Sequence, residues 1–262
     1  MTIKKIKLFV NKKEKSKEVA SLFKTALVSN GYELVENDCD LAIAVGGDGS
    51  FLGMVRSNNF DPNCYYIGIN TGTLGFLQEL SFEDLDDFIK YLKGGEYRYD
   101  YFDIQKTTVD TETSQYNFTS LNEVVIRRIG LNALGLKVLI NKEELENYVG
   151  DGVLVSTTIG STAYNMSFGG SIVDFDLKTM QITPIAPITN RKYRNLRNSL
   201  VIPDNKVITI LPSKSDLILT VDGENKELTK VKKIEIRIDE TKIKCLRFHT
   251  AAISSRIASK LL

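Results

Sequence analysis

The sequence is poor in the residues from which many metal and disulfide sites are built. It contains one histidine, His249, which excludes any metal site that needs several histidine ligands. Its cysteines, Cys39, Cys64 and Cys245, are too few and too widely spaced for a zinc motif or a disulfide framework. Such cysteine usage is typical of a protein from a reducing compartment.

Neither sign of charge is in excess, and long hydrophobic runs are absent. Lys and Arg total 34 against 33 Asp and Glu, so the net charge of +1 gives no field that would attract nucleic acid or an anionic membrane. No apolar run approaches the roughly 18 residues of a membrane span. The apolar runs in MTIKKIKLFV, at the start, are too short and interrupted for a signal peptide. We therefore expect a cytoplasmic protein that binds neither nucleic acid nor membrane.

The sequence does contain two successive patterns of hydrophobicity. From residue 3 to about 93, short apolar runs alternate with amphipathic helical patterns, which predicts a parallel sheet with covering helices. From about residue 100, short β-branched runs separated by turn residues predict an all-β layer structure. We expect a Rossmann-like α/β domain at residues 1–98 and a β-rich, β-sandwich-like domain at residues 99–249. Residues 250–262 should form a helix that packs back on the first domain.

The apolar run LAIAV, at residues 41–45, leads directly into a glycine-rich turn. Such a run predicts a buried parallel strand, and ligands in α/β folds bind beyond the carboxyl ends of the strands. Gly46, Gly47 and Gly49 would let backbone amides approach phosphate oxygens closely. The helix predicted after them would favour an anion at its N-terminus. The turn is therefore interpreted as a phosphate-binding loop.

Asp48, within that turn, fits neither of the two common nucleotide motifs. A P-loop would need GK[ST] after the glycines, and that is absent. A dinucleotide fingerprint would place Asp48 against a pyrophosphate, which repels a carboxylate unless a cation or a hydroxyl group intervenes. We interpret Asp48 as a carboxylate aimed at a hydroxyl that attacks an adjacent phosphate. The alternative is an ordinary strand-to-helix turn in which Asp48 caps the helix.

Two more stretches carry polar or glycine-rich features beside predicted strands. TGTLGFL, at residues 71–77, places a second glycine-rich turn at a strand end, with Phe76 supplying apolar surface. SLNEVVI places Asn122 and Glu123 side by side in an apolar strand, so one of them is forced off the face that its neighbours prefer. The pair suits a ribose diol or an adenine edge, and the alternative is a strand end exposed to water.

The fourth stretch, residues 149–170, combines a second GDG with a hydroxyl-rich turn. Asp151 lies in the GDG, and a short strand follows it. Ser161 and Thr162 then suit the N-terminus of a helix that begins near Ala163, where free amides could bind a ligand. Helix capping alone would explain these two hydroxyl residues, but not the combination of GDG, GST and FGG.

Together the four stretches resemble one family, the bacterial NAD kinases of the ATP-NAD kinase family. The matching motifs are GGDGSFL from Gly46, NTGTLGFL from Asn70, the NE pair, the GDG at Asp151, and GSTAYNMSFGG from Gly160. Their order and spacing agree with the family over nearly the whole chain. The resemblance implies an α/β domain followed by a β-rich domain. It also implies transfer of the γ-phosphoryl group of ATP to the 2′-hydroxyl of the adenosine ribose of NAD.

The resemblance implies a role for each candidate residue. Asp48 would orient the ribose hydroxyl and accept its proton, while the loop glycines face ATP with Mg²⁺ or another divalent cation. Asn122 and Glu123 would bind polar groups of NAD, and Asp151 would contact its nicotinamide half. Thr162, Ala163, Tyr164 and Ser167 would line the adenine and ribose subsites, with Phe76 and Ala186 packing nearby.

The chain departs from the family pattern at three places. GGDGS replaces GGDGT, which keeps a hydroxyl at Ser50. Thr158 and Ile159 stand where the family has proline and threonine, so the sequence alone does not determine the geometry of the loop before Ser161. Glu224 follows Gly223 where relatives often carry a neutral or cationic residue, which could alter affinity near a phosphate.

Other functions share part of this pattern. Lipid kinases of the diacylglycerol kinase type and phosphofructokinases also carry a GGDG loop. The GFL after Leu74, the NE pair and GSTAY argue against a lipid kinase. A non-catalytic NADP sensor on the same fold is the other alternative, and the presence of Asp48 argues against it. Relatives are dimers or tetramers, so we expect a homodimer or homotetramer. Inorganic polyphosphate is an alternative phosphoryl donor to ATP.

Overall fold

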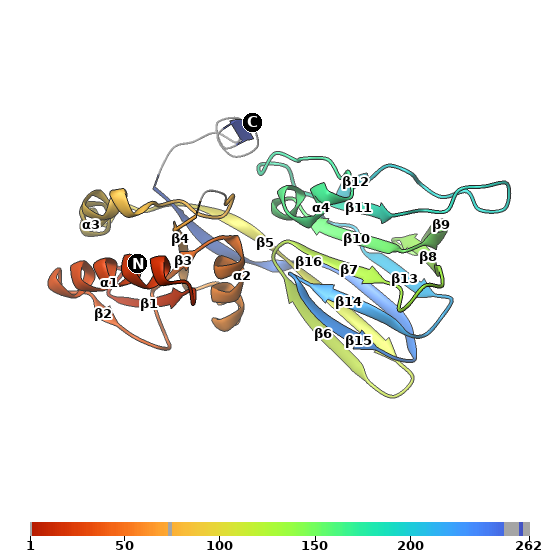
Figure 1. Cartoon of the computed structure of the whole chain (residues 1–262), viewed down its shortest axis with the longest axis horizontal. Helices are drawn as coiled ribbons and strands as arrows, with labels where there is room; N and C mark the ends of the chain where they lie inside the picture. The colour runs from red at the N-terminus through yellow and green to blue at the C-terminus, as the bar shows by residue number, and fades with distance from the viewer. Residues whose placement is uncertain (1, 73–74, 249–256, 259–262) are drawn as a thin grey trace. The chain divides into compact units, whose positions relative to one another are not determined.

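The computed structural model describes residues 2–72, 75–248 and 257–258, and it divides into two compact units. Unit 1 comprises the chain up to Phe102 and again from Lys242, and unit 2 comprises Asp103–Thr241 (Figure 1). These limits differ from the expected 98 and 250 because strands β5 (Arg98–Thr111) and β16 (Val231–Arg247) each run unbroken from one unit into the other. The expected packing of residues 250–262 falls outside the described residues, apart from 257–258.

Unit 1 is a parallel sheet with helices, as the alternating pattern predicted. Its strands lie in the order β2-β1-β3-β4-β16, and each neighbouring pair in this order is parallel. Every residue of β3 is buried, which agrees with its uniformly apolar sequence. The bounds of these strands are β1 (Lys5–Val10), β2 (Glu33–Leu34), β3 (Leu41–Gly46) and β4 (Tyr65–Asn70).

The helices of unit 1 bury apolar stripes against this sheet. Helix α1 (Glu14–Ser29) contributes Val19, Phe23 and Leu27 to the core. Helix α2 (Asp48–Ser57) follows β3 directly. A short 3₁₀ turn, η1 (Phe82–Asp84), leads into α3 (Leu85–Gly94). Ser81 precedes this 3₁₀ turn, and both its backbone N–H and its hydroxyl donate to Oδ2 of Asp84, at 2.7 and 2.9 Å.

Unit 2 consists of two sheets that enclose one apolar core, the β-sandwich-like structure expected. One sheet has the order β12-β11-β10-β7-β14-β15, and the other contains β16, β13, β8 and β9, with β5 pairing to β6. Val124 and Val153 from the first sheet and Ile208 and Ile234 from the second share the core. The bounds are β6 (Gln115–Ser120), β7 (Glu123–Arg127), β8 (Leu134–Ile140), β9 (Glu143–Gly150), β10 (Gly152–Thr157), β11 (Thr179–Ile185), β12 (Leu200–Pro203), β13 (Ile208–Pro212), β14 (Leu217–Val221) and β15 (Glu224–Leu228).

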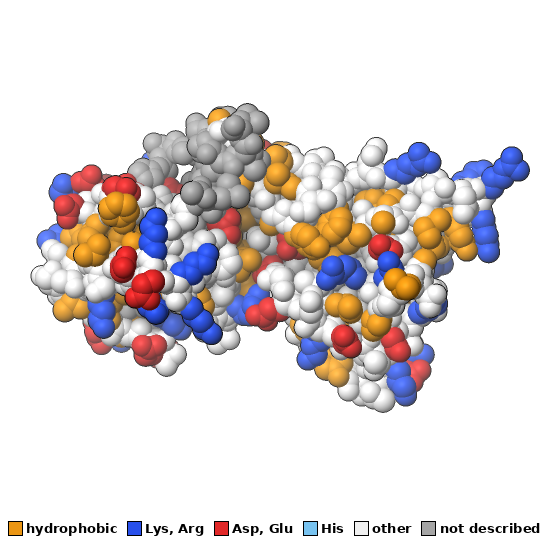
Figure 2. Space-filling model, viewed as in Figure 1, with side chains coloured by type: hydrophobic (Ala, Val, Ile, Leu, Met, Phe, Trp, Pro, Cys, Tyr) orange, Lys and Arg blue, Asp and Glu red, His pale blue; other side chains and the backbone are white. Residues whose placement is uncertain are grey.

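Three further observations concern the surface charge, the cysteines and the lengths of the helices. On the face drawn in Figure 2, basic and acidic side chains are interspersed on each unit, in keeping with the balanced composition. Cys39 and Cys64 are buried free thiols whose sulfur atoms lie 3.3 Å apart, a neighbourhood that their spacing in the sequence does not reveal. In the part of the chain that the structure describes, no helix is long and apolar enough to cross a membrane.

Candidate active site

The first cluster of predicted site residues lies in unit 1, at the carboxyl ends of β3 and β4. These strands are parallel neighbours, with Gly46 opposite Asn70, so the turns that follow them meet at one edge of the sheet. Helix α2 begins at Asp48, and its N-cap is Gly47. Asp48 is therefore the first residue of the helix rather than its cap.

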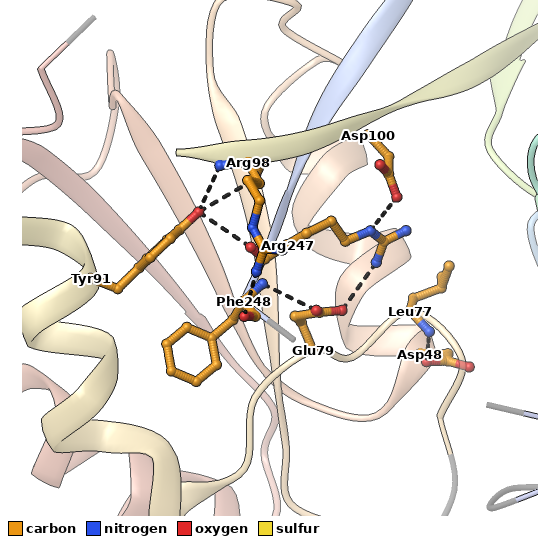
Figure 3. Close-up of polar contacts among 8 residues, drawn as sticks. All are labelled: Asp48, Leu77, Glu79, Tyr91, Arg98, Asp100, Arg247 and Phe248. Atoms are coloured by element: carbon orange, nitrogen blue, oxygen red, sulfur yellow. Dashed lines mark hydrogen bonds and ion pairs between the residues drawn. The ribbon is translucent and has the colours of Figure 1, made fainter. Parts of the chain in front are cut away.

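The carboxylate of Asp48 turns toward the second glycine-rich turn (Figure 3). The backbone N–H of Phe76 donates to its Oδ2 at 2.8 Å, and the N–H of Leu77 donates to its Oδ1 at 3.0 Å. A Cβ on Gly75 would lie 2.9 Å from Oδ1 of Asp48, so only glycine lets the turn approach so closely. The two motifs are thus joined through one carboxylate with both oxygens oriented.

The glycines of the first turn serve different purposes. Gly46 has a φ of 155°, and a Cβ there would lie 2.2 Å from the hydroxyl oxygen of Ser50, so the fold requires glycine. At Gly47 and Gly49 a Cβ would meet nothing within 4 Å, and neither has a positive φ. These two glycines leave open space beside the N-terminus of α2, where backbone amides favour an anion.

The second cluster lies in unit 2, where Asp222 holds the strand that carries Asn122 and Glu123. Its carboxylate accepts hydrogen bonds from the N–H groups of Leu121 at 2.7 Å, Asn122 at 2.8 Å and Glu123 at 3.2 Å. Asp222 itself has a φ of 44°, which is uncommon for a residue other than glycine. Asp222 was not identified as a site residue from the sequence, since no local signal marks a contact between groups about a hundred positions apart.

Asn122 and Glu123 are buried, yet each presents a polar atom without a hydrogen-bond partner among the described residues. These atoms are Oδ1 of Asn122 and Oε2 of Glu123. Burial, with the nearby charge of Asp222 as a second cause, raises the pKa of Glu123 to about 8, and the backbone N–H of Tyr164 opposes that rise. At neutral pH the Glu123 carboxyl therefore carries a proton that it can donate.

The hydroxyl-rich turn packs directly on this pair. It forms a 3₁₀ turn, η2 (Ile159–Thr162), followed by the short helix α4 (Tyr164–Ser167). A Cβ on Gly160 would lie 2.0 Å from the backbone oxygen of Asn122, which explains the glycine of GST. The side chain of Asn165 donates to the backbone oxygens of Ser161 and Ser171 and accepts from Thr183, which stabilises the turn.

The predicted ligand residues of this turn differ in how accessible they are. Ser161 is fully buried, and its hydroxyl oxygen accepts a hydrogen bond from the N–H of Val173 at 3.1 Å, so it serves the fold. Tyr164 and Ser167 are exposed, and the Tyr164 ring packs edge-on against Phe168 with 4.7 Å between ring centroids. Thr162 and Ala163 are half-buried.

Asp151 and Ala186 lie together at the ends of β9 and β11. The N–H of Asp151 donates to the oxygen of Ile185, the residue before Ala186, at 3.0 Å. Oδ1 of Asp151 accepts from Nε of Arg128 at 2.6 Å, in a partly exposed ion pair. Ala186 is exposed and has a φ of 46°. Arg128 was not identified from the sequence, because its pairing depends on how β7 and β10 lie together.

Comparison with known proteins bears on both units. Residues 3–97 match the ATP-NAD kinase N-terminal domain, and residues 121–250 match the ATP-NAD kinase C-terminal domain. An NAD kinase of Finegoldia magna is 34% identical over 254 residues, which cover 93% of this chain and 92% of the relative. The chain belongs to the ATP-NAD kinase family. The resemblance inferred from the four motifs is confirmed, and the enzymatic activity of the chain is NAD kinase activity.

Further relatives and solved structures agree with membership of the NAD kinase family. An NAD kinase of Lactobacillus helveticus is 33% identical over 262 residues, 98% of this chain and 96% of the relative. A yeast NADH kinase complexed with NADH has a TM-score of 0.88 over 98% of this chain and 87% of that chain, at 20% identity. An Archaeoglobus fulgidus NAD kinase in complex with ATP has a TM-score of 0.75 over 97% and 98% of the two chains, at 22% identity. These two structures share the fold.

Thr158, which stands where the NAD kinase pattern has proline, keeps the backbone that proline would impose. Its φ is −56°, close to the proline value of about −65°. Its hydroxyl lies within hydrogen-bonding distance of the backbone oxygens of Leu177 at 2.8 Å and Thr179 at 3.0 Å. The departure therefore exchanges a rigid ring for hydrogen bonds to Leu177 and to Thr179, the first residue of β11.

Proposed function

We propose that this chain transfers the γ-phosphoryl group of ATP to the 2′-hydroxyl of the adenosine ribose of NAD, with Asp48 as the residue that orients the hydroxyl. The observation that supports this proposal is the position of the Asp48 carboxylate, whose two oxygens accept hydrogen bonds from the amides of Phe76 and Leu77. The names of the curated relatives support NAD as the acceptor, and the solved relatives bound to NADH and to ATP support both ligand classes.

The amide contacts suit Asp48 to this task. Each carboxylate oxygen has two acceptor sites, so one amide on each leaves a lone pair on each for an incoming hydroxyl. In the transfer, the ribose oxygen forms a bond to the γ-phosphorus, the bond between that phosphorus and the leaving oxygen breaks, and ADP departs. The hydroxyl proton passes to Asp48. Phosphoryl transfer has a loose transition state, so fixing the hydroxyl in line matters more than the basicity of the carboxylate.

The open space at Gly47 and Gly49 is proposed to receive the phosphates of ATP. Backbone amides at the N-terminus of α2 would face the phosphate oxygens. Among the described residues, no three His, Cys, Asp or Glu side chains gather in a way that could hold a metal ion. Mg²⁺ is commonly bound through substrate phosphates and only one or two carboxylates, so we propose that it arrives with ATP and neutralises their charge.

The unit 2 cluster is proposed to bind NAD. The unpartnered Oδ1 of Asn122 accepts, and the protonated Glu123 donates, which matches the mixed donors and acceptors of a ribose diol or an adenine edge. Asp151 is proposed to contact the nicotinamide half. Ser161 is proposed to support the turn from within the fold. Thr162, Ala163, Tyr164 and Ser167 are proposed to line the adenine and ribose subsites, with Phe76 and Ala186 packing nearby.

The proposal is tested by incubating the purified chain with Mg²⁺-ATP and NAD and measuring NADP with an NADP-specific dehydrogenase. We expect NADP to accumulate only when both substrates and the divalent cation are present.

A parallel reaction with inorganic polyphosphate in place of ATP identifies the donor, and size-exclusion chromatography tests the proposed homodimer or homotetramer. Fractionation of the source cells tests the proposed cytoplasmic location. If no NADP forms with either donor while NADP still binds, the sensor function replaces the kinase.

A further inference from the structure

The turn that leaves β4, whose amides hold Asp48, ends in a buried ion pair between Glu79 and Arg247, at the C-terminal end of β16. The guanidinium of Arg247 donates from NH1 to Oε2 of Glu79 at 3.1 Å (Figure 3). Side-chain exposure is only 10% for Arg247 and 2% for Glu79. The other carboxylate oxygen of Glu79 accepts the backbone N–H of Phe248 at 3.1 Å. Both oxygens of Glu79 are therefore fixed by the end of one strand.

Glu79 is also fixed through its backbone. The N–H groups of Glu79 and Leu80 both donate to the oxygen of Gly68 in β4, each at 2.9 Å. The N–H of Asn70 donates to the oxygen of Leu80 at 2.7 Å. The turn that leaves β4 is thus closed at residues 79–80, two positions beyond the Leu77 amide that holds Asp48.

Arg247 has a second carboxylate neighbour that does not belong to this turn. Its Nε donates to Oδ2 of Asp100, in β5, and its guanidinium lies over the ring of Phe102, 5.0 Å from the centroid. The side chain of Asp100 is 57% exposed. Water can therefore screen Asp100 but not Glu79, and the two carboxylates differ in how strongly they depend on Arg247.

We propose that Arg247 is a positioning residue for Asp48. Through Glu79 it fixes the turn whose amides, from Phe76 and Leu77, orient the Asp48 carboxylate. The inference rests on the proposed role of Asp48 in transfer. Removing either partner of a buried ion pair leaves the other charge without its partner, which is strongly unfavourable, so the turn would shift. A shift of about 1 Å in a catalytic group can lower the rate by about 100-fold.

The chain offers a matched pair of variants to test this. Glu79→Gln and Asp100→Asn each remove one carboxylate from the same guanidinium, but only Glu79 belongs to the turn. For Glu79→Gln we expect kcat to fall by about 10- to 100-fold while the KM for NAD changes by less than about threefold. Asp100→Asn should keep kcat within about twofold of the parent chain. Arg247→Lys, which retains the charge but not the planar geometry, should lie between the two.

A second readout does not depend on catalysis. Hydrogen exchange followed by mass spectrometry, in the full-length chain, reports the protection of the Phe76 and Leu77 amides. Their exchange should accelerate in Glu79→Gln and remain unchanged in Asp100→Asn. Arg247→Lys should accelerate it partially, and it serves as the test if Glu79→Gln does not fold. Unchanged exchange of these two amides in both Glu79→Gln and Arg247→Lys would overturn the proposal. Equal losses of kcat in Glu79→Gln and Asp100→Asn would also overturn it.

Failure of the proposed function has a different signature. If Asp48→Asn retains full activity, Asp48 is not the transfer residue, whatever the exchange of Phe76 and Leu77 shows. If Asp48→Asn is inactive and Glu79→Gln is fully active, only the role of Arg247 is lost.

Discussion

Asp48 and Glu123 are carboxylates in contrasting surroundings, and their chemistry differs accordingly. Both oxygens of Asp48 accept backbone amides, and the side chain is half-buried, so the carboxylate is held in one orientation. Glu123 is buried, has one oxygen without a partner among the described residues, and lies close to Asp222. These surroundings favour a protonated carboxyl that donates.

Asp48→Asn is expected to lower kcat by about 10²- to 10⁴-fold, the usual contribution of a positioned acid or base. The amide group has one acceptor oxygen, so its NH₂ would face one of the two backbone donors, and it cannot take up the hydroxyl proton. Steady-state kinetics and calorimetric NAD binding measure this, and we expect NAD to bind still. Asp87→Asn, on the exposed surface of α3, is the matched control. Full activity in Asp48→Asn would contradict the proposed mechanism.

Glu123 should make stability depend on pH. Its pKa of about 8 in the folded chain lies above the ordinary value of 4.5, so between those values the folded state holds a proton that the unfolded chain has lost. The free energy of unfolding should therefore decrease as the pH rises from about 4.5 to about 8, by at most about 1.4 kcal/mol per pH unit. Urea unfolding across this range measures the effect.

Glu123→Gln should remove this contribution and flatten the profile. Glu144→Gln, which alters an exposed carboxylate of the same unit paired with Lys137, should keep the slope of the parent chain. Identical slopes for the parent chain and Glu123→Gln would show that folding does not raise the pKa of Glu123.

At the scale of elements, the η2 turn depends on contact with the residues that precede β7. Gly160→Ala would place a methyl group 2.0 Å from the backbone oxygen of Asn122, and neither backbone can yield easily. We expect a loss of about 1–3 kcal/mol in the free energy of unfolding, as for overpacked sites. The KM for NAD should rise as well, because Asn122 moves.

Gly94→Ala is the control for that substitution. Gly94 ends α3, and a Cβ there meets nothing within 4 Å. Alanine is a better helix former than glycine, so this variant should be neutral or slightly stabilising. Thermal unfolding of both variants, followed by circular dichroism, decides the matter, and equal stability of the two would contradict the close approach of Gly160 to Asn122.

At the scale of the whole molecule, the two units depend differently on chain continuity. Unit 2 is one uninterrupted segment, whereas unit 1 needs the end of β16. Lys244 and Cys245 pair with β4, and Leu246 lies in the core of unit 1. A fragment that ends at Phe102 would lose this strand and leave Glu79 without Arg247.

We therefore expect residues 103–241 to fold alone and residues 1–102 to fail to do so. Circular dichroism and thermal unfolding of the two fragments measure this, with the full chain as reference. A cooperative transition in the fragment 1–102 would show that β16 is dispensable for unit 1. No transition in the fragment 103–241 would show that the complete β5 and β16 strands are needed by unit 2.

Local patterns in the sequence predicted much of this architecture. The uninterrupted apolar run of β3 predicted a buried parallel strand, and the β-branched runs after residue 100 predicted the sandwich. The sequence placed both glycine-rich turns at strand ends, and parallel strand ends meet at one edge of a sheet, which agrees with the contact between Asp48 and Phe76. The four motifs in order predicted the family.

What the sequence by itself determined is therefore the set of elements, the positions of the glycine-rich turns and membership of the NAD kinase family, because periodicity and motif spacing are local properties of the chain. Only the tertiary structure decided which distant groups meet. Asp222 accepts hydrogen bonds from amides about a hundred positions away in the sequence. Arg247 pairs with Glu79, 168 positions away, and Cys39 lies beside Cys64. These contacts depend on strand order and register, which place side chains together without any local pattern to mark them.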